Sequence, residues 1–493
     1  MQHRNFTLSL FVVLSAILIA ACETTGAEKQ SSKPISPNDS RLVLLHLGDL
    51  HGHIDVGAQG RGGYARIAHL IKEERAKAGP KTDVVVIAPG DVVDKGNLPC
   101  RNTKDRACLA LLSSVGIDLA VLGNAELYRG QSGIAEIAKY SKIPWVSSNV
   151  TTSTTSPSAS WKEEYFYRGP KSGAKFWLFS WVRNPYTGRE IPRSSKIKIK
   201  EVINDRDWAS WAQKSQIAPV LWVHHQRWED DLGFAADACS QEGLKSLAFI
   251  SADDHVENFD STACAPVAQA APYGESIGRF EFSVNSEVQL FYSSHKFIKV
   301  DESVEQDGVV LKLVEDLYAR YAPKAREVIA QLPSGLSQTE VGEWIAEAMR
   351  NSTHTDLALL NSGAIKSGLQ PGALDREKLF LAAPYNNNIM GLDWSFSSLE
   401  SSLCAASKRE KNPELDDGSD LYIAGGKLVG AGTDDCKLEV KNKRRSLKVA
   451  VDSYLLGRSN RWLGRDISRV AFRFGFKTEE VVERYLKKNR GFH

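Results

Sequence analysis

Residues 44–53 read LLHLGDLHGH, an apolar run followed by Gly48 and by three side chains of metal-ligand type, Asp49, His51 and His53. The apolar residues 42–45 are typical of a buried strand. Gly48 permits a sharp turn off this strand because it lacks a side chain. Open α/β sheets bind their ligands beyond the carboxyl ends of the strands. The stretch therefore predicts an α/β domain with a ligand site at the end of its first strand.

Further apolar runs alternate with helix-like segments along the chain. Strands are predicted at 84–87, 119–122, 220–223 and 247–250, helices at 62–78 and near 106–115, and a β-rich segment at 280–300. A cluster of turn-forming residues at 332–335 precedes a second region, with a helix at 341–349 and strands at 357–360, 421–429 and 447–451. This alternation indicates two α/β regions, and we place their boundary near residue 325.

The composition is that of a large globular protein. The chain has 493 residues, of which 42% are hydrophobic and 25% charged, with a net charge of +2. That length predicts two or three domains, and the apolar fraction is ample for sizeable cores. The balance of charge excludes a wholly disordered chain and a polybasic nucleic-acid binder, so we expect no nucleic-acid partner.

The N-terminus has the pattern of an export signal. A basic start precedes an apolar run from Phe6 to Ala21, which predicts a signal peptide at 1–21. A transmembrane anchor is the alternative, but the run is short for a membrane span and a polar tract follows it. Residues 18–22, LIAAC, resemble the bacterial lipobox, which implies cleavage before Cys22 and lipidation of its thiol. Residues 22–40 would then form a flexible tether.

A lipidated Cys22 would place the protein at the bacterial cell envelope, attached to a membrane through its lipid. Glu23, rather than an aspartate, follows the cysteine, and by resemblance to enteric sorting rules this favours the outer membrane, facing the periplasm or the cell surface. Six cysteines remain, an even number that suggests disulfides in an exported protein. Fifteen pairings are possible, and closeness in sequence favours 100–108, 239–264 and 404–436.

Each predicted strand of the first region ends in residues that can bind metals. Besides Asp49 and His51, these ends carry Asp91, Asn124, the pair at 224–225, and Asp253 with His255. A two-metal hydrolase needs a carboxylate that bridges ions about 3.5–4 Å apart, with imidazole and oxygen ligands around them. One such residue alone would more often be a helix cap or a surface group. Five strand ends together predict a shared metal pocket.

Several of these blocks resemble the bacterial 5'-nucleotidases, within the calcineurin-like metallophosphoesterases. Residues 44–53 resemble the family's opening signature, and 62–66, 90–91, 123–124 and 148–150 match its following blocks in order. In the second region, NSGAIK at 361–366 resembles an Asn-x-Gly-Gly-Ile-Arg block, and PYNNN at 384–388 resembles a Pro-Phe-Gly-Asn-Thr block.

The resemblance implies a four-layer β-sandwich flanked by helices at 41–305, a linker helix at 306–330 and a smaller α/β C-terminal domain at 331–493. It also implies two divalent cations, Zn, Mn, Mg or Fe. Asp91 would bridge the two ions. Asp49, His51 and His255 would complete one site. The other site would be completed by Asn124, His224 and Asp253, where His224 is chosen over His225 from its place at the strand end.

The substrate implied by the resemblance is a nucleotide or a related phosphoester. Lys366 would meet its phosphate or ribose where the family has arginine, and Tyr422 is a candidate to stack on a base. The complete set of predicted substrate-binding residues is Asn361, Lys366, Tyr385, Asn387, Tyr422 and Trp462.

The third block departs from the family pattern. Active relatives have Gly-Asn-His-Glu-Phe-Asp, whereas this chain has Gly-Asn-Ala-Glu-Leu-Tyr, so Ala125 and Tyr128 replace the phosphate-stabilising histidine and the aspartate that orients it. Such a pair contributes about 10²–10⁴ in rate. Two hypotheses remain: a phosphoesterase with reduced activity at the cell envelope, and a catalytically inactive binding protein on the same scaffold. Asp253, where the family has histidine, would shift the preference toward harder ions.

Overall fold

The computed structural model describes residues 40–488, apart from 58, 95, 153–160, 184–196, 409–420, 442, 465 and 468–470 and the side chains of Arg461 and Trp462. The predicted signal peptide, Cys22 and the tether up to residue 39 lie outside the described residues. Within the described part, no helix combines the length and the apolar character that a bilayer span requires.

The first domain is built on two six-stranded sheets. The first sheet has the order β14-β13-β1-β2-β3-β4, with parallel pairing from β1 to β4 and antiparallel pairing of β1 with β13. Its strands are β1 (Ser40–Leu47), β2 (Thr82–Ala88), β3 (Leu119–Val121), β4 (Trp145–Val146), β13 (Ser276–Val284) and β14 (Leu290–Lys299). The second sheet has the order β11-β12-β10-β9-β7-β6. Its strands are β6 (Tyr165–Arg168), β7 (Lys175–Val182), β9 (Val220–His225), β10 (Ser246–Ser251), β11 (Asn258–Asp260) and β12 (Val267–Gln269).

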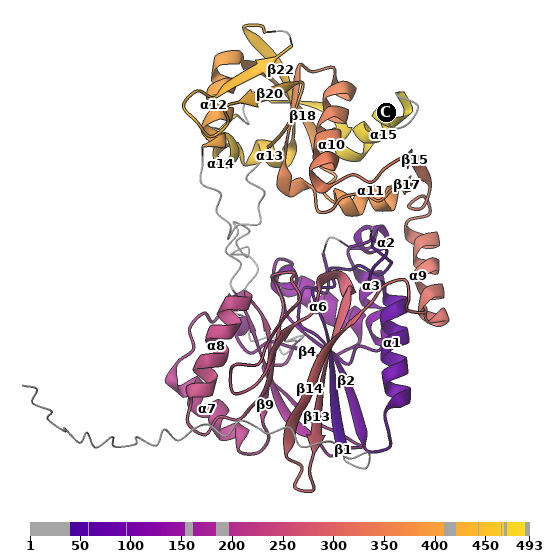
Figure 1. Ribbon diagram of the computed structural model, residues 1–493, viewed down its shortest axis with the longest axis vertical. Helices are drawn as coiled ribbons and strands as arrows, with labels where there is room; N and C mark the ends of the chain where they lie inside the picture. The colour runs from indigo at the N-terminus through magenta and orange to yellow at the C-terminus, as the bar shows by residue number, and fades with distance from the viewer. Residues whose placement is uncertain are drawn as a thin grey trace, which may run out of the picture. The chain divides into compact units, whose positions relative to one another are not determined.

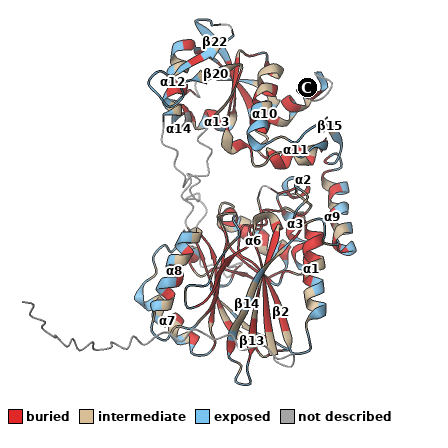
Figure 2. Cartoon of the chain, viewed as in Figure 1, coloured by how far each residue is buried: buried red, intermediate tan, exposed pale blue. Residues whose placement is uncertain are grey.

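The two sheets pack face to face and helices cover their outer faces (Figures 1 and 2). Leu44, Leu178 and Phe280 belong to the apolar core between the sheets. Helices α1 (Tyr64–Lys77) and α6 (Gly130–Ser141) pack on the first sheet, and α7 (Asp205–Ser215) and α8 (Trp228–Ser240) pack on the second. The predicted four-layer sandwich is confirmed.

The second domain is a five-stranded sheet of order β19-β16-β22-β18-β23. Its strands are β16 (Leu357–Asn361), β18 (Asn388–Ser395), β19 (Leu421–Ala424), β22 (Ser446–Asp452) and β23 (Phe472–Lys477). Helices α10 (Gln338–Thr353) and α15 (Thr478–Lys488) pack on one face, and α12 (Phe396–Ser407), α13 (Ser453–Gly457) and α14 (Ser459–Leu463) on the other. Short elements border the sheet: β15 (Val328–Leu332), β17 (Gly372–Asp375), α11 (Arg376–Ala382), β20 (Gly426–Val429) and β21 (Lys437–Val440).

Three predicted elements differ from the structure. The helix expected at 306–330 is α9 (Gly308–Tyr321), which ends two residues before Pro323 because proline disfavours helical geometry in the residue before it. The helix expected near 106–115 is two short helices, α3 (Arg106–Leu109) and α4 (Leu112–Val115). The strand expected at 421–429 is broken at Gly425, whose φ of 82° interrupts the ladder.

All three expected disulfides are present. They join Cys100 to Cys108, Cys239 to Cys264 and Cys404 to Cys436, with Cα–Cα distances of 5.4, 5.6 and 5.7 Å. The first bond fastens α2 (Leu98–Asn102) to α3 in the first domain. The third fastens α12 to the segment that enters β21 in the second domain.

Candidate metal centre

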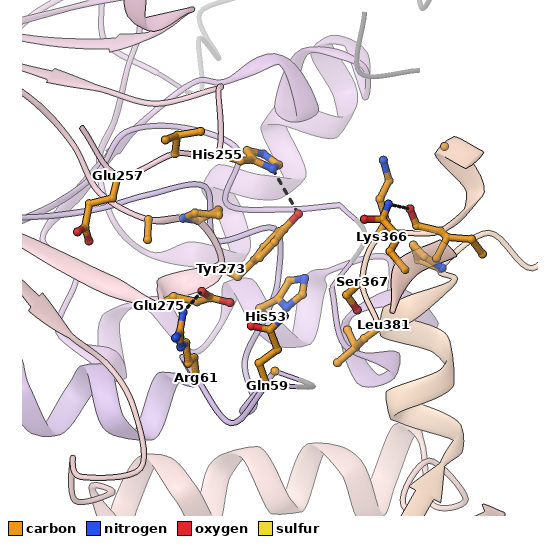
Figure 3. A pocket seen from close by; sticks show the side chains of 18 of the residues that line it. His53, Gln59, Arg61, His255, Glu257, Tyr273, Glu275, Lys366, Ser367 and Leu381 are labelled. Carbon is orange, nitrogen blue, oxygen red and sulfur yellow. Dashed lines mark hydrogen bonds and ion pairs between the residues drawn. The ribbon is translucent and has the colours of Figure 1, made fainter. Parts of the chain in front are cut away.

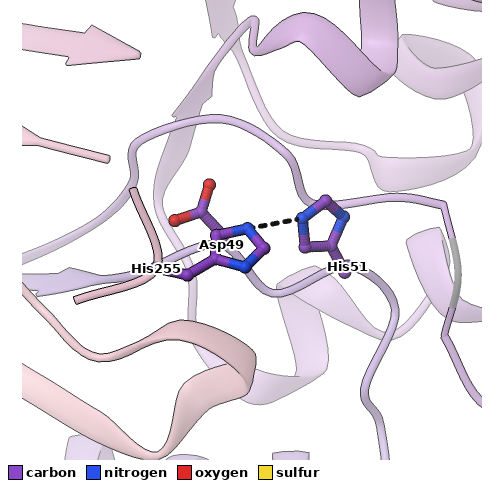
Figure 4. Close-up of side chains that lie close together, drawn as sticks. All are labelled: Asp49, His51 and His255. Carbon is purple, nitrogen blue, oxygen red and sulfur yellow. Dashed lines mark hydrogen bonds between the residues drawn. The ribbon is translucent and has the colours of Figure 1, made fainter. Parts of the chain in front are cut away.

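Two groups of acidic and imidazole side chains meet beyond the ends of β1, β2, β9 and β10. Asp49, His51 and His255 form the first group, which Figure 4 shows, and Asp49, Asp91 and His225 form the second. Within each group the potential ligand atoms lie within 4.8 Å of one another. The parallel strands explain this convergence, since their carboxyl ends lie at one edge of each sheet.

Asp91 lies between His51 of the first group and His225 of the second. Its Oδ2 lies 3.5 Å from His51 Nε2, and its Oδ1 lies 3.2 Å from His225 Nε2. The backbone N–H of Ala125 also donates to Oδ1, at 2.7 Å. One carboxylate oxygen therefore faces each side of the site, which is the arrangement that a bridging ligand requires.

His225, rather than His224, belongs to this centre, so the sequence-based choice of His224 is corrected. Neighbouring residues of a strand point to opposite faces, and His224 shares the outer face of β9 with Trp222. There its Nδ1 lies 2.7 Å from Asp231 Oδ1 and its ring packs against Phe234. His225 points the other way, toward Asp49 and Asp91.

Asn124 and Asp253 lie on the His225 side of the centre. Asn124 Nδ2 donates to Asp253 Oδ1 at 2.9 Å, and the same oxygen lies 3.5 Å from His225 Nε2. The backbone N–H of Asp253 donates to Asp49 Oδ2 at 3.3 Å, which links this side to the first group. With His225 in place of His224, the predicted ligand residues gather in one region.

The backbone around the centre is unusually strained. A positive φ is uncommon for residues other than glycine, and such outliers cluster at functional sites. Five residues at this centre have one: His51 (44°), Asp91 (45°), Asp253 (110°), His255 (59°) and Tyr273 (58°). The packing around Gly123 is equally tight, because a Cβ there would lie 2.3 Å from Asp91 Oδ1.

A buried carboxylate that the sequence analysis did not single out supports this backbone. Glu126 is fully buried and accepts hydrogen bonds from the N–H groups of Gly123, Asp91, Val92 and Val93, at 2.8–3.2 Å. Burial and the neighbouring Asp91 carboxylate raise the pKa of Glu126 to about 7. Glu126, the residue after Ala125, therefore fixes the loop that carries Asp91 through these four hydrogen bonds.

The electrostatics of the centre suit a cation. Burial opposes ionisation of Asp91, yet the His225 and His51 imidazoles hold its pKa below the usual range. Against the effect of burial, the carboxylates of Asp91, Asp253 and Asp49 raise the pKa of His225. Asp49 Oδ1 is buried and accepts no hydrogen bond from the described residues. A site with several carboxylate and imidazole ligands, and with a buried carboxylate oxygen that accepts no hydrogen bond from the described residues, fits a divalent cation.

A cavity of about 650 Å³ opens beside the first group (Figure 3). The first domain contributes His53, Arg61, His255 and Tyr273 to its lining. The second domain contributes Lys366 and its neighbours Ser362, Gly363, Ile365 and Ser367. The cavity therefore combines one candidate metal ligand, His255, with the two cationic side chains Arg61 and Lys366.

The predicted substrate-binding residues are not all at this cavity. Lys366 lines it, and the Lys366 ammonium lies 6.0 Å from the centre of the Tyr385 ring. Asn361 is buried at the start of the loop that carries Lys366. Asn387 has a structural role, because its Nδ2 donates to Asp452 and its carbonyl accepts from the backbone of Thr478.

The two remaining predicted substrate-binding residues, Tyr422 and Trp462, belong to β19 and α14 of the second domain. Tyr422 packs against α10, where a Cβ on Gly342 would lie 2.1 Å from its ring. Trp462 belongs to α14, and its side chain lies outside the described part of the structure.

The third block has an alanine at position 125 and a tyrosine at position 128. Ala125 is 3% exposed and contributes only its backbone N–H to Asp91. Tyr128 directly follows the short helix α5 (Asn124–Leu127) and is half-buried.

A four-layer sandwich with carboxylates and imidazoles at its strand ends defines the class of metallophosphoesterases. The sequence matches the calcineurin-like phosphoesterase family over residues 42–257 and the C-terminal domain of 5'-nucleotidases over residues 321–426. The chain thus carries a calcineurin-like phosphoesterase domain followed by a 5'-nucleotidase C-terminal domain.

The relatives have low sequence identity to this chain, but the similarity extends over most of its length. The endonuclease YhcR of Bacillus subtilis is 22% identical over 75% of this chain, and the chain spans about a third of that protein (33%). The 5'-nucleotidase of Vibrio cholerae is 22% identical over 77% of this chain and 78% of its own length. A 5'-nucleotidase precursor from Thermus thermophilus has a similar fold, with a TM-score of 0.69, 17% identity, and coverage of 92% of this chain and 97% of that one.

Proposed function

We propose that the protein is a metal-dependent phosphoesterase that hydrolyses nucleotides or related phosphoesters, with reduced activity. The observation that carries this proposal is the pair of ligand groups that share Asp49, with Asp91 between their histidines. The match to two domains that occur together in 5'-nucleotidases supports the substrate class.

In this mechanism the side chains have separate roles. Asp49, His51, Asp91 and His255 would hold one divalent cation. Asp91, His225, Asn124 and Asp253 would hold a second one. Bound cations would polarise the phosphoryl oxygen and activate water.

The cavity supplies the remaining interactions with substrate. Lys366 of the second domain and Arg61 of the first would attract the negative charge of the phosphoester into the cavity that His255 lines. Ala125 has no side-chain group that could stabilise the phosphoryl group or protonate the leaving group, so hydrolysis would require charge stabilisation by bound cations and a good leaving group.

Metal content and hydrolysis test this proposal together. Purified protein is analysed for bound metal and assayed on a panel of 5'-nucleotides and activated phosphoesters. The Asp91→Asn variant is compared with Asp237→Asn, which alters an exposed carboxylate on α8. We expect Asp91→Asn to lose metal and activity while Asp237→Asn keeps both. Hydrolysis that is unchanged by Asp91→Asn would refute the proposal.

A binding protein without catalytic activity is the second candidate, and Ala125 and Tyr128 favour it. The double variant Ala125→His, Tyr128→Asp restores the residue pair of the family. A large gain in hydrolysis would indicate an otherwise intact centre, and a native protein that binds no metal would favour the binding role.

We also propose that the protein is anchored at the cell envelope through a lipid on Cys22. The lipobox-like stretch at 18–22 supports this location. In a bacterial host that carries out lipoprotein processing, the full chain should sediment with membranes and incorporate labelled fatty acid, and Cys22→Ala should do neither. Membrane association that persists in Cys22→Ala without fatty acid incorporation in the parent would contradict it.

A further inference from the structure

Tyr273 lies beside the first ligand group, and the sequence analysis did not identify it. Its hydroxyl lies 3.3 Å from His255 Nδ1, as Figure 3 shows, and its ring stacks on His53 with 4.3 Å between ring centres. Its backbone N–H donates to the carbonyl of Asp49 at 2.7 Å. Three contacts therefore fix Tyr273 against the loops that carry Asp49 and His255.

The backbone of Tyr273 is itself in an unfavourable conformation. Its φ is 58°, a region that residues other than glycine adopt rarely. A surrounding structure must impose such a conformation. The next residue, Gly274, also has a positive φ, of 70°, but is a glycine, so Tyr273 is the residue of this turn that adopts the region with a large side chain. This indicates that the side chain of Tyr273 has a role of its own.

The hydrogen bonds of His51 define which of its nitrogens carries the proton. His51 Nδ1 lies 3.2 Å from the carbonyl oxygen of Val93, which can only accept. A neutral His51 therefore carries its proton on Nδ1 and directs the lone pair of Nε2 into the first ligand group.

His255 needs two different tautomers. Its Nε2 lies 3.1 Å from His51 Nε2, and where His51 is neutral, His255 can pair with it by carrying its proton on Nε2 and donating to the lone pair of His51. A cation held by both Nε2 atoms requires the proton of His255 to be on Nδ1 instead. Nδ1 is thus a hydrogen-bond acceptor in the first state and a donor in the second.

Only a group that both donates and accepts can serve His255 Nδ1 in the two states. A tyrosine hydroxyl does so, whereas a carbonyl or an ammonium could serve one state alone. We propose that Tyr273 is a positioning residue that pairs with both tautomers of His255 and thereby aligns Nε2 for a divalent cation. No proton is gained or lost by His255 in this exchange, since the proton moves from Nε2 to Nδ1. The inference rests on the proposed metal-dependent function.

The test compares Tyr273→Phe with Tyr292→Phe. Phenylalanine keeps the ring and its stacking on His53 and removes only the hydroxyl. Tyr292 lies on β14, makes edge-to-face contacts with Phe280 and Phe282, and serves as the matched control. The affinity of the metal-stripped full chain for Zn²⁺ is measured by competition with a chelating dye. Loss of a partner of this kind weakens metal affinity by about 10–100-fold, which is the result we expect for Tyr273→Phe alone.

A second readout reports the tautomer directly and does not depend on activity. Nitrogen-15 spectra of histidine-labelled protein distinguish protonated from unprotonated ring nitrogens, and addition of Zn²⁺ should move the His255 proton from Nε2 to Nδ1. Equal Zn²⁺ affinity of Tyr273→Phe and the parent would overturn the inference and leave the proposed function intact. Absence of Zn²⁺ binding by the parent would overturn both, and the circular dichroism of each variant confirms that it is folded.

Discussion

Replacement of Glu377 by glutamine should make the protein more stable at neutral pH and leave it unchanged in acid. Glu377 lies in α11 and is 6% exposed. Its Oε1 accepts from Asn97 Nδ2 at 2.8 Å and from the backbone N–H of Leu98 at 3.1 Å, both in the first domain. Burial raises the pKa of Glu377 to about 7 in spite of these donors, with a smaller contribution from Asp55.

The direction and size of the effect follow from this pKa. An unfolded glutamate releases its proton near pH 4.5, whereas folded Glu377 keeps it to about pH 7. Unfolding therefore releases a proton between these values, and the free energy of unfolding falls as pH rises through that window. A shift of this size corresponds to about 3 kcal/mol, lost between acid and pH 8. A neutral glutamine accepts the same two hydrogen bonds at every pH and avoids this loss.

Urea unfolding between pH 4.5 and 8 measures the effect. The stability of Glu377→Gln relative to the parent should rise by about 3 kcal/mol over this range and level off above pH 8. Glu242→Gln, which alters an exposed glutamate of the first domain, should show no comparable trend. A stability difference between Glu377→Gln and the parent that is the same at pH 4.5 and pH 8 would refute the reasoning.

Three further substitutions test the interior and the metal centre. Glu126→Ala leaves buried N–H groups without an acceptor, and calorimetry should register a loss of about 3 kcal/mol or more. Gly278→Ala places a Cβ 1.9 Å from Nε2 of the fully buried His46, and denaturant unfolding should show a loss of about 1–3 kcal/mol. Asp253→His replaces a carboxylate by an imidazole, so the ratio of the Zn²⁺ to the Mn²⁺ dissociation constant should fall; an unchanged ratio would exclude Asp253 from the ligand set.

Short apolar runs alternating with helix-like segments were sufficient to predict the α/β class, whereas the four-layer sandwich followed from the resemblance to a known family. Boundaries were less predictable where a single residue decides them. Because of Pro323, α9 ends at Tyr321, nine residues before the end expected for the linker helix. Gly425 divides one expected strand into β19 and β20. Both residues were visible in the sequence, but their effect depends on the backbone conformation that the neighbouring packing selects.

The candidate site was predictable in its residue types and less so in its geometry. Alternation along β9 could have identified His225, because Trp222 and His224 share a face that packs under α8. Tyr273 carried no such signal: it lies eighteen residues after His255 and reaches it only through a turn with φ of 58°. Side chains that act through long-range contacts of this kind become visible only when the fold is known.

The pairing of β1 with β13 has a consequence for how the protein is made. Ser40 pairs with Val284 and Leu47 with Ile277, so one edge of the first strand has no partner until nearly 300 residues have been synthesised. Until then a strand that contains the apolar run 42–45 exposes a free edge, which is prone to associate with other chains. His255 also joins late, which makes the capacity to hold a cation one of the last properties that the nascent first domain acquires.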